Sequence, residues 1–381
     1  MARAALRLLG FLLGAALLRA AGPTPIANVR IGRVEYVRAT DVAARLGLKV
    51  RYEGAKRLLL SDGAHHLEVP APGATDLKEI SLDGLKIFLG DPTVVRAGQL
   101  YFSRIDFEHR LLPLLRPAAS PPPPSVHVIA IDPGHGGSDN GTQNPRLHLM
   151  EKTFTLDVGL RLRKLLEAQG YQVVMTRTND SRFANDPKVD LPLRAEFANT
   201  KHADLFLSIH FNAGGTASDV SSHGTEVYTF PPEHQRATAS WGSGVDDGEL
   251  GLASVVRFNA WSVLFAHAMH EELHRRLGTE DRGERLRHLG VLRPLNCPGI
   301  LVESAFLTND AEGRRVATPA FRQEMAEAML AGIHAYVAAI DSLRPGAAHG
   351  MAPAAAHLLP AVPAAPESAP PKGFQPPRRP S

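Results

Sequence analysis

The chain has 381 residues, of which 44% are hydrophobic and 21% charged, so it is typical of a globular protein with one large or two ordinary domains. Its formal net charge of +3 equals the contribution of Arg3, Arg7 and Arg19, which stand in an N-terminal stretch without acidic residues. The rest of the chain therefore has no basic excess. This balance argues against a nucleic-acid partner.

Residues 1–21 have the pattern of a secretory signal peptide: two arginines, an apolar stretch over Leu8–Leu18, and small residues near Ala21. The apolar stretch is shorter than the roughly 20 residues that cross a bilayer, so we expect no membrane span in the mature form. The alternative is a buried N-terminal helix. We therefore expect an exported protein of the periplasm or cell envelope. Cys297 is the single cysteine, which rules out an intramolecular disulfide, and we interpret it as a small apolar residue.

Proline-rich segments divide the remaining chain. Residues 117–125 contain "SPPPPS", which predicts a stiff, extended linker. Residues 343–381 are rich in proline and alanine and hold too few large apolar residues for a core, so we expect a disordered tail. Two folded regions are left, residues 22–116 and residues 126–342.

Residues 22–116 predict a small β-rich domain, with short strands and Asp-Gly or Gly turns around one helix that contains Asp41. His65 and His66 are adjacent in a predicted strand and point to opposite faces, which argues against a shared metal site. The pattern loosely resembles the copper amine oxidase N-terminal-like domain of some bacterial wall proteins. That resemblance implies a spacer or a wall-binding module rather than a copper site.

Residues 126–342 alternate predicted strands and helices. The strands are "VHVIAID", "YQVVMTR", "DLFLSIHFNA" and "GILVESAF"; the helices cover residues 153–169, 191–200 and 257–277 and a last segment that begins after Thr318. We expect "GTEVYTF" to be hairpin-like. The alternation predicts an α/β fold, a three-layer sandwich with a mostly parallel central sheet.

Four side chains stand out at the ends of these elements. His135 lies in the turn "DPGHGGSDNG" and His210 in "SIHFNAG", each after or at the end of an apolar strand. Functional groups gather beyond such carboxyl ends in open α/β sheets. Glu151 precedes a helix, where its ordinary role is to interact with the helix dipole. Glu303 lies inside an apolar strand, where a buried carboxylate needs an arginine or a metal as its partner.

Two histidines and one carboxylate make a three-ligand zinc site with a fourth position open for water. A further glutamate that binds no metal would serve as general base beside that water. The residue types therefore fit metal-assisted hydrolysis. Their spacing differs from the His-Glu-x-x-His pattern of a single helix, so the fold has to bring the ligands together.

From "VIAIDPGHGG" to "VESAFLTN" the larger region resembles the zinc-dependent N-acetylmuramoyl-L-alanine amidases of the amidase 3 type. The matching stretches include "DPGHGG", "LPLRAEFAN", "SIHFNA" and "GTEVYTF", in this order. The resemblance implies one Zn²⁺ per catalytic domain, held by His135, Glu151 and His210, with Glu303 as the catalytic acid and base. It also implies peptidoglycan as the partner, cleaved at the amide bond between N-acetylmuramic acid and the L-alanine of the stem peptide.

Supporting roles are expected for other residues of the matching stretches. Arg177, Arg194 and Asn199 are interpreted as structural, anchoring a loop and packing a helix. Asp132 is expected to orient the loop or His135, as carboxylates behind metal ligands do.

Two segments depart from the family pattern. Residues 214–222 and 231–251 are rich in glycine and serine and predict a mobile loop, so we expect an ungated or loosely gated site. Arg285, Arg287 and Arg293 predict a basic rim that attracts the carboxylates of the stem peptide, and the alternative is a solvated surface. Two other functions stay open: a non-catalytic peptidoglycan-binding or regulatory module with the same fold, and a zinc deacetylase. Any protein activator also stays open.

Overall fold

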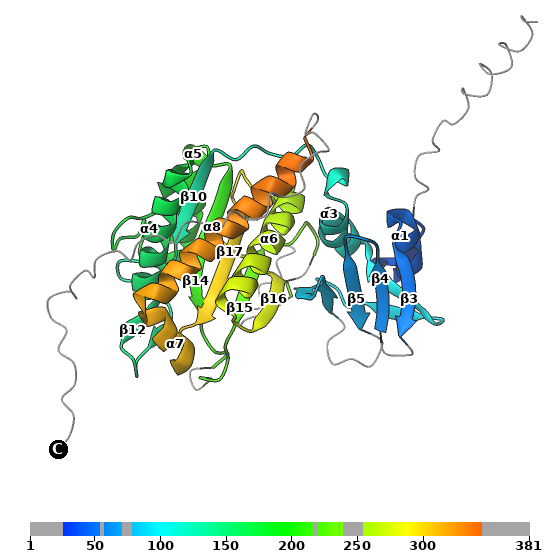
Figure 1. Ribbon diagram of the computed structural model, residues 1–381, viewed down its shortest axis with the longest axis horizontal. Coiled ribbons are helices and arrows are strands. Elements are labelled where there is room, and N and C mark those ends of the chain that lie inside the picture. Colours follow the sequence, from blue (N-terminus) through cyan, green and yellow to red (C-terminus); the bar gives the residue numbers. More distant parts are fainter. Residues whose placement is uncertain are drawn as a thin grey trace, which may run out of the picture. The chain divides into compact units, whose positions relative to one another are not determined.

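The computed structural model describes residues 26–344 except 54–56, 71–77, 217–218, 236 and 239–253 (Figure 1). The described residues all belong to one compact unit. The expected signal peptide, all but the first two residues of the expected C-terminal tail and most of the loop expected after residue 231 lie outside them. In the part of the chain that is described, no helix is both long enough and apolar enough to cross a membrane.

A mixed sheet of 11 strands forms the centre of this unit. From one edge to the other its strands are β13 (Gln172–Met175), β10 (Val128–Pro133), β14 (Leu205–Asn212), β17 (Gly299–Phe306), β15 (Thr225–Thr229), β16 (Asp281–Leu286), β7 (Leu85–Phe88), β6 (Glu79–Leu82), β5 (His66–Pro70), β4 (Arg57–Ser61) and β3 (Lys49–Glu53). Strands β13, β10, β14 and β17 are parallel to one another. The mostly parallel sheet expected for the larger region is therefore confirmed.

Helices cover both faces of this part of the sheet, as a three-layer sandwich requires. The helices α4 (Glu151–Ala168), α6 (Asn259–Leu277) and α8 (Pro319–Ser342) lie together over one face (Figure 1). On that side Ile129 and Ile131 of β10 join the larger apolar core. Ala130, between them in sequence, packs on the opposite side with α5 (Pro187–Thr200) in a second core. Alternate strand residues thus supply the two cores, because successive side chains of a strand point to opposite faces.

The helix ends follow the local signals of the sequence. Gly278 ends α6 in the left-handed conformation, at φ 58°, and the Thr318 side chain caps α8 by accepting from the backbone N–H of Phe321. Asn309 caps α7 (Asp310–Ala317) in the same way. Helix α4 begins at Glu151, two residues earlier than expected, directly after a two-stranded ribbon of β11 (Gln143–Asn144) and β12 (Leu149–Met150). Glu151 therefore follows the ribbon directly and is the first residue of α4.

The segment "GTEVYTF" is not hairpin-like. It forms β15, which lies inside the sheet, antiparallel to β17 and parallel to β16. The five residues of β15 are all buried, so a pairing with distant strands on both sides satisfies its backbone. Strand β16 was not expected from the sequence, because its residues "DRGERL" are mostly charged.

The β-rich residues 26–116 join this sheet rather than standing apart from it. Strand β7 pairs in parallel with β16, and the buried guanidinium of Arg110 donates to the carbonyl of Glu284 at 2.9 Å. A second sheet contains β1 (Asn28–Ile31), β2 (Val34–Arg38), β9 (Gln99–Ser103) and β8 (Val94–Arg96). The helical segments here are α1 (Ala39–Leu46), α2 (Arg104–Asp106), η1 (Phe107–Leu111), α3 (Leu112–Leu115) and η2 (Pro117–Ala119). The residue boundaries of the domains stay a prediction.

Candidate metal centre

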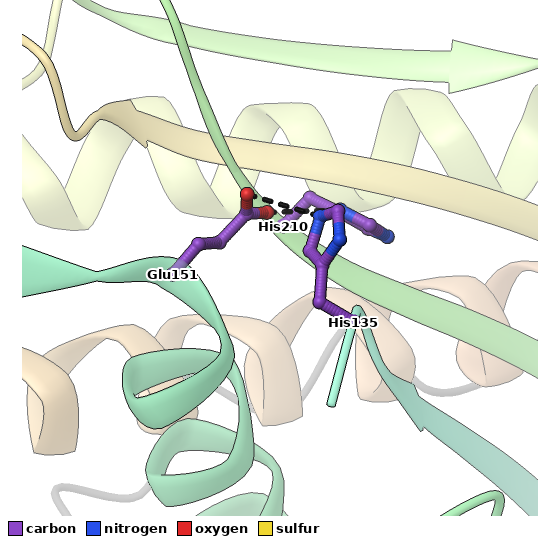
Figure 2. Close-up of side chains that lie close together, drawn as sticks. All are labelled: His135, Glu151 and His210. Atoms are coloured by element: carbon purple, nitrogen blue, oxygen red, sulfur yellow. Dashed lines mark hydrogen bonds and ion pairs between the residues drawn. The ribbon is translucent and has the colours of Figure 1, made fainter. Parts of the chain in front are cut away.

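Three side chains from distant parts of the chain converge at the carboxyl ends of the central strands β10 and β14. His135 follows β10, Glu151 opens α4 and His210 lies on β14, and Figure 2 shows the two rings and the carboxylate pointing toward one another. One donor atom from each residue lies within 4.8 Å of the donors of the other two. The Glu151 carboxylate is 3.0 Å from Nε2 of His135 and 2.9 Å from Nδ1 of His210. The fold thus brings together the three ligands that the family resemblance implies.

Glycines make the space in which these side chains meet. A Cβ atom at Gly134 would lie 2.2 Å from the His210 ring, and one at Gly141 would lie 2.5 Å from Oε2 of Glu151. Gly141 also has a φ of 64°, in the left-handed region that glycine adopts without strain. His135 has a φ of 63°, which is uncommon for a residue with a Cβ. The glycines thus leave room for the three side chains, and the positive φ of His135 is part of the turn that presents its ring.

Buried arginines hold the His135 loop in place. Arg194 of α5 donates to the carbonyl of His135 and to the Asp132 carboxylate, each at 2.9 Å. Arg177 donates to the carbonyls of Pro133 and Gly134, and both arginines are buried. These bonds hold the carbonyls of Pro133, Gly134 and His135, at the end of β10 and the start of the loop.

Asp132 and Asp139 divide the role that was expected of Asp132 alone. Asp132 is buried and accepts from the hydroxyls of Thr176 and Ser208, at 2.6 and 2.7 Å, as well as from Arg194. It therefore ties the loop to β14 and to the end of β13. The His135 ring is oriented by Asp139, whose carboxylate is 2.9 Å from Nδ1. Sequence reasoning missed Asp139, although it stands four residues after His135 in the same glycine-rich turn.

Glu151 is the most buried of the three residues, and its carboxylate interacts with both histidine rings. Its side chain is 2% exposed, and it accepts backbone N–H groups of Thr142 and Phe211 at 2.7 and 2.9 Å. Burial opposes the charge of Glu151, but hydrogen bonds from His135 and His210 outweigh it and lower the pKa of this carboxyl well below its usual range. Burial likewise lowers the pKa of His135, but Glu151 and Asp139 reverse this and raise it to about 9.

Glu303 lies beside the three converging residues. On β17 it is paired in register with His210 of β14 on one side and with Glu226 of β15 on the other. Its Oε2 atom is buried and has no hydrogen-bond partner among the described residues, which also form no ion pair with it within 4.0 Å. Burial, followed by the charges of Glu151 and Glu226, raises the pKa of Glu303 well above its usual range, against the effect of Arg287. The described residues therefore offer no salt bridge to Glu303, which was the alternative expected from the sequence.

Glu226 was not singled out by the sequence. Its carboxylate accepts from the side chains of Asn212 at 2.8 Å, Tyr228 at 2.5 Å and Arg282 at 2.9 Å. Arg285 lies 3.4 Å from the same carboxylate. A buried charge with four polar neighbours is stable in this position, and it places a second carboxylate next to Glu303.

The other residues named from the sequence lie away from the centre. Asn199 donates to the carbonyl of Pro294 and accepts from the N–H of Asn296, so it fastens α5 to the segment before β17. Cys297 is buried, as expected of a small apolar residue. His65 and His66 pair with Asp83 and Glu68 respectively, each at 3.2 Å.

The donor set fits zinc. Two imidazoles and one carboxylate are the ligands of an open zinc site, and Asp139 behind His135 is the usual partner of a ligating ring. The fold and the site together define an α/β protein with a candidate His-Glu-His metal site at the carboxyl ends of its central strands, beside a carboxyl group, Glu303, whose Oε2 has no hydrogen-bond partner among the described residues.

Residues 129–335 match the protein family described as N-acetylmuramoyl-L-alanine amidase, which is more than half of the chain. The chain therefore belongs to the N-acetylmuramoyl-L-alanine amidase family.

Known proteins match over the same region. The chain is 33% identical over 207 residues to the N-acetylmuramoyl-L-alanine amidase CwlM of Bacillus licheniformis, covering 54% of this chain and 66% of that one. It is 32% identical over 233 residues to the amidase AmiC of Escherichia coli O6:H1, covering 55% and 53%. A cell wall amidase of Bacillus anthracis is 32% identical over 210 residues, covering 55% and 35%. The chain thus spans less than two thirds of the length of these relatives.

Among solved structures, the catalytic domain of CwlV, an N-acetylmuramoyl-L-alanine amidase from Bacillus (Paenibacillus) polymyxa, matches with 27% identity and a TM-score of 0.45. The match covers 56% of this chain and 99% of that one.

Proposed function

We propose that this chain hydrolyses the amide bond between N-acetylmuramic acid and the L-alanine of the peptidoglycan stem peptide, with Zn²⁺ held by His135, Glu151 and His210. The observation that carries the proposal is the convergence of these three donors within 4.8 Å, next to Glu303, whose Oε2 has no hydrogen-bond partner in the described part of the chain. Family membership supplies the substrate class. The expected signal peptide supports action in the periplasm or cell envelope.

The chemistry divides between the metal and the chain. Held by these three residues, Zn²⁺ would act as a Lewis acid toward a carbonyl oxygen and would lower the pKa of bound water. His135 and His210 present their rings, and Asp139 fixes the orientation of the His135 ring through Nδ1. Arg177 and Arg194 hold the backbone of the His135 loop by donating to the carbonyls of Gly134 and His135.

Glu303 carries the proton. As a carboxylate, its Oε2 accepts a proton from the water that attacks the amide carbonyl carbon. The same carboxyl then donates this proton to the alanine nitrogen as the C–N bond breaks. The products are a free lactyl carboxylate on the sugar and a free amine on the stem peptide. A raised pKa suits this double role, because the carboxyl has to hold the proton between the two transfers.

Digestion of peptidoglycan tests the proposal. The full chain from residue 22 onward is incubated with purified peptidoglycan, and the products are identified by mass spectrometry, with a chelator-treated sample as control. The proposal predicts stem peptides that begin with a free alanine amine and that disappear after chelation. Release of acetate instead would assign a deacetylase, and binding without any release from zinc-loaded protein would assign a non-catalytic wall-binding module.

A further inference from the structure

Three arginines line β16 and the residue after it, and they differ in their partners. Arg282 and Arg285 are both within 4.0 Å of the Glu226 carboxylate, at 2.9 and 3.4 Å. Arg285 is further held by the Phe88 ring, whose centroid is 3.9 Å from the guanidinium carbon. Glu226 and Phe88 thus fix these two side chains within the protein.

Arg287 has no such partner. Within the described residues its guanidinium has no carboxylate within 4.0 Å and makes no side-chain hydrogen bond. Its backbone N–H continues the sheet by donating to the carbonyl of Thr229 at 3.0 Å, and its guanidinium carbon is 5.9 Å from the centre of the Tyr228 ring. The side chain is partly buried rather than extended into solvent. A half-buried guanidinium that the sheet holds in place, and that has no carboxylate partner among the described residues, can bind an anionic ligand.

The position of Arg287 relates it to the reaction. It lies two residues beyond Arg285, so its side chain leaves the sheet on the same face as those of Arg285 and Glu226, and its charge favours a lower pKa for Glu303. Glu303 returns the proton to the alanine nitrogen in the proposed reaction, so the departing peptide lies on the Glu303 side of the cleaved bond. The carboxyl group of alanine is itself bound in a peptide bond. In a stem whose next residue is acidic, the first free carboxylate is therefore that of the residue that follows alanine.

We propose that Arg287 binds the free carboxylate of the residue that follows L-alanine in the stem peptide, and so selects acidic over amidated stems. The inference rests on the proposed amidase function. A guanidinium suits this task because its planar fork donates two parallel hydrogen bonds to a carboxylate, whereas a carboxamide offers one acceptor and places a donor against a donor.

The test uses two synthetic N-acetylmuramoyl-L-alanyl peptides that differ in one group: the residue after alanine carries a free carboxylate in one and a carboxamide in the other. The zinc-loaded full chain should cleave the carboxylate peptide with a kcat/KM about tenfold to a hundredfold higher, the range for a hydrogen bond to a charged group. Arg287→Gln should remove most of this preference by lowering kcat/KM for the carboxylate peptide alone. Arg287→Lys should keep part of it, because it retains the charge without the fork.

Arg163→Gln is the matched control, since Arg163 lies on α4 in an exposed pair with Glu167 and should leave the preference unchanged. Equal cleavage of both peptides by the unaltered chain would overturn the assignment of Arg287 while leaving the amidase proposal intact. So would an Arg287→Gln variant that loses activity on both peptides to the same degree. Cleavage of neither peptide by zinc-loaded chain would overturn the amidase proposal and, with it, this inference.

Discussion

Glu226 and Glu303 lie directly opposite each other on the adjacent strands β15 and β17. Glu226 is held by Tyr228 and Arg282, whereas Oε2 of Glu303 has no partner among the described residues. Two neighbouring carboxyl groups in different surroundings do not share one protonation behaviour, because the charge of one disfavours the charge of the other. We therefore interpret Glu226 as a structural carboxylate and Glu303 as the carboxyl group that exchanges a proton.

Replacing Glu226 by Gln should shift the acid limb of the pH profile of kcat/KM toward lower pH. The substitution removes a negative charge that raises the pKa of Glu303, so Glu303 becomes a competent base at lower pH. A like charge on the residue directly opposite shifts a pKa by about one unit or more. The measurement is kcat/KM between pH 4 and 9, with Glu272→Gln on α6 as a control far from the site. An unchanged acid limb would show that Glu226 does not act on the proton-carrying group.

Replacing Asp139 by Asn should weaken zinc binding by about tenfold to a hundredfold, the usual effect of removing the carboxylate behind a ligating histidine. Asp139 accepts from Nδ1 of His135 and so fixes which ring nitrogen faces the metal. Competition with a fluorescent chelator measures the affinity. Asp157→Asn is the control, because Asp157 pairs with Arg161 and Arg322 on the helical side. Equal zinc affinity in the Asp139 variant and the unaltered chain would contradict the role of Asp139.

The buried His270 should make stability depend on pH. It lies between Asp281, at 2.9 Å, and Glu284, at 3.5 Å, with His267 also against Glu284. Burial lowers the pKa of His270, but Asp281 and Glu284 outweigh this and raise it to about 9.

Because the folded pKa is above the unfolded value of about 6.5, the stabilisation from protonated His270 is complete below pH 6.5 and is lost as the pH rises toward 9. His270→Gln should therefore lower the free energy of unfolding most at pH 6, by on the order of 2–3 kcal/mol, and least at pH 9. Urea unfolding at both pH values measures this difference. A loss that is the same at pH 6 and pH 9 would contradict a protonated His270.

A chain that begins at residue 120 should be less stable and more prone to aggregate than the full chain. Removing the β-rich region uncovers the edge of β16, where β7 and the buried Arg110 are now bound, and an uncovered strand edge pairs with other chains. Thermal unfolding and light scattering of the two chains test this. Equal melting temperatures and monodisperse behaviour would show that residues 26–116 are a separable spacer.

Local patterns in the sequence were sufficient for much of the fold and for the position of the two histidines of the candidate metal site. The apolar runs of β10, β14 and β17 predicted buried strands, and Thr318 and Gly278 marked helix ends by their own chemistry. His135 and His210 stand at strand ends, where a parallel sheet brings side chains together, so their convergence followed from the fold class.

The remaining features depend on contacts between distant residues. Strand β16 has a charged sequence, and Glu284 is buried only because His267 of α6 and Arg110 meet it. The pairing of β7 with β16 joins segments almost 200 residues apart, which no local pattern indicates. Glu226 likewise acquires its role from the neighbouring strand, since only the register places it opposite Glu303.

The measurement that tests the central claim most directly compares zinc content and turnover in Glu303→Gln and His135→Ala, using a defined N-acetylmuramoyl-L-alanyl peptide. The account predicts that Glu303→Gln binds one zinc per chain and loses turnover by about a hundredfold to ten-thousandfold, because it removes the proton carrier and none of the ligands. His135→Ala should instead lose zinc, because it removes one of three ligands. A Glu303→Gln variant with full turnover, or a His135→Ala variant with full zinc content, would contradict the account.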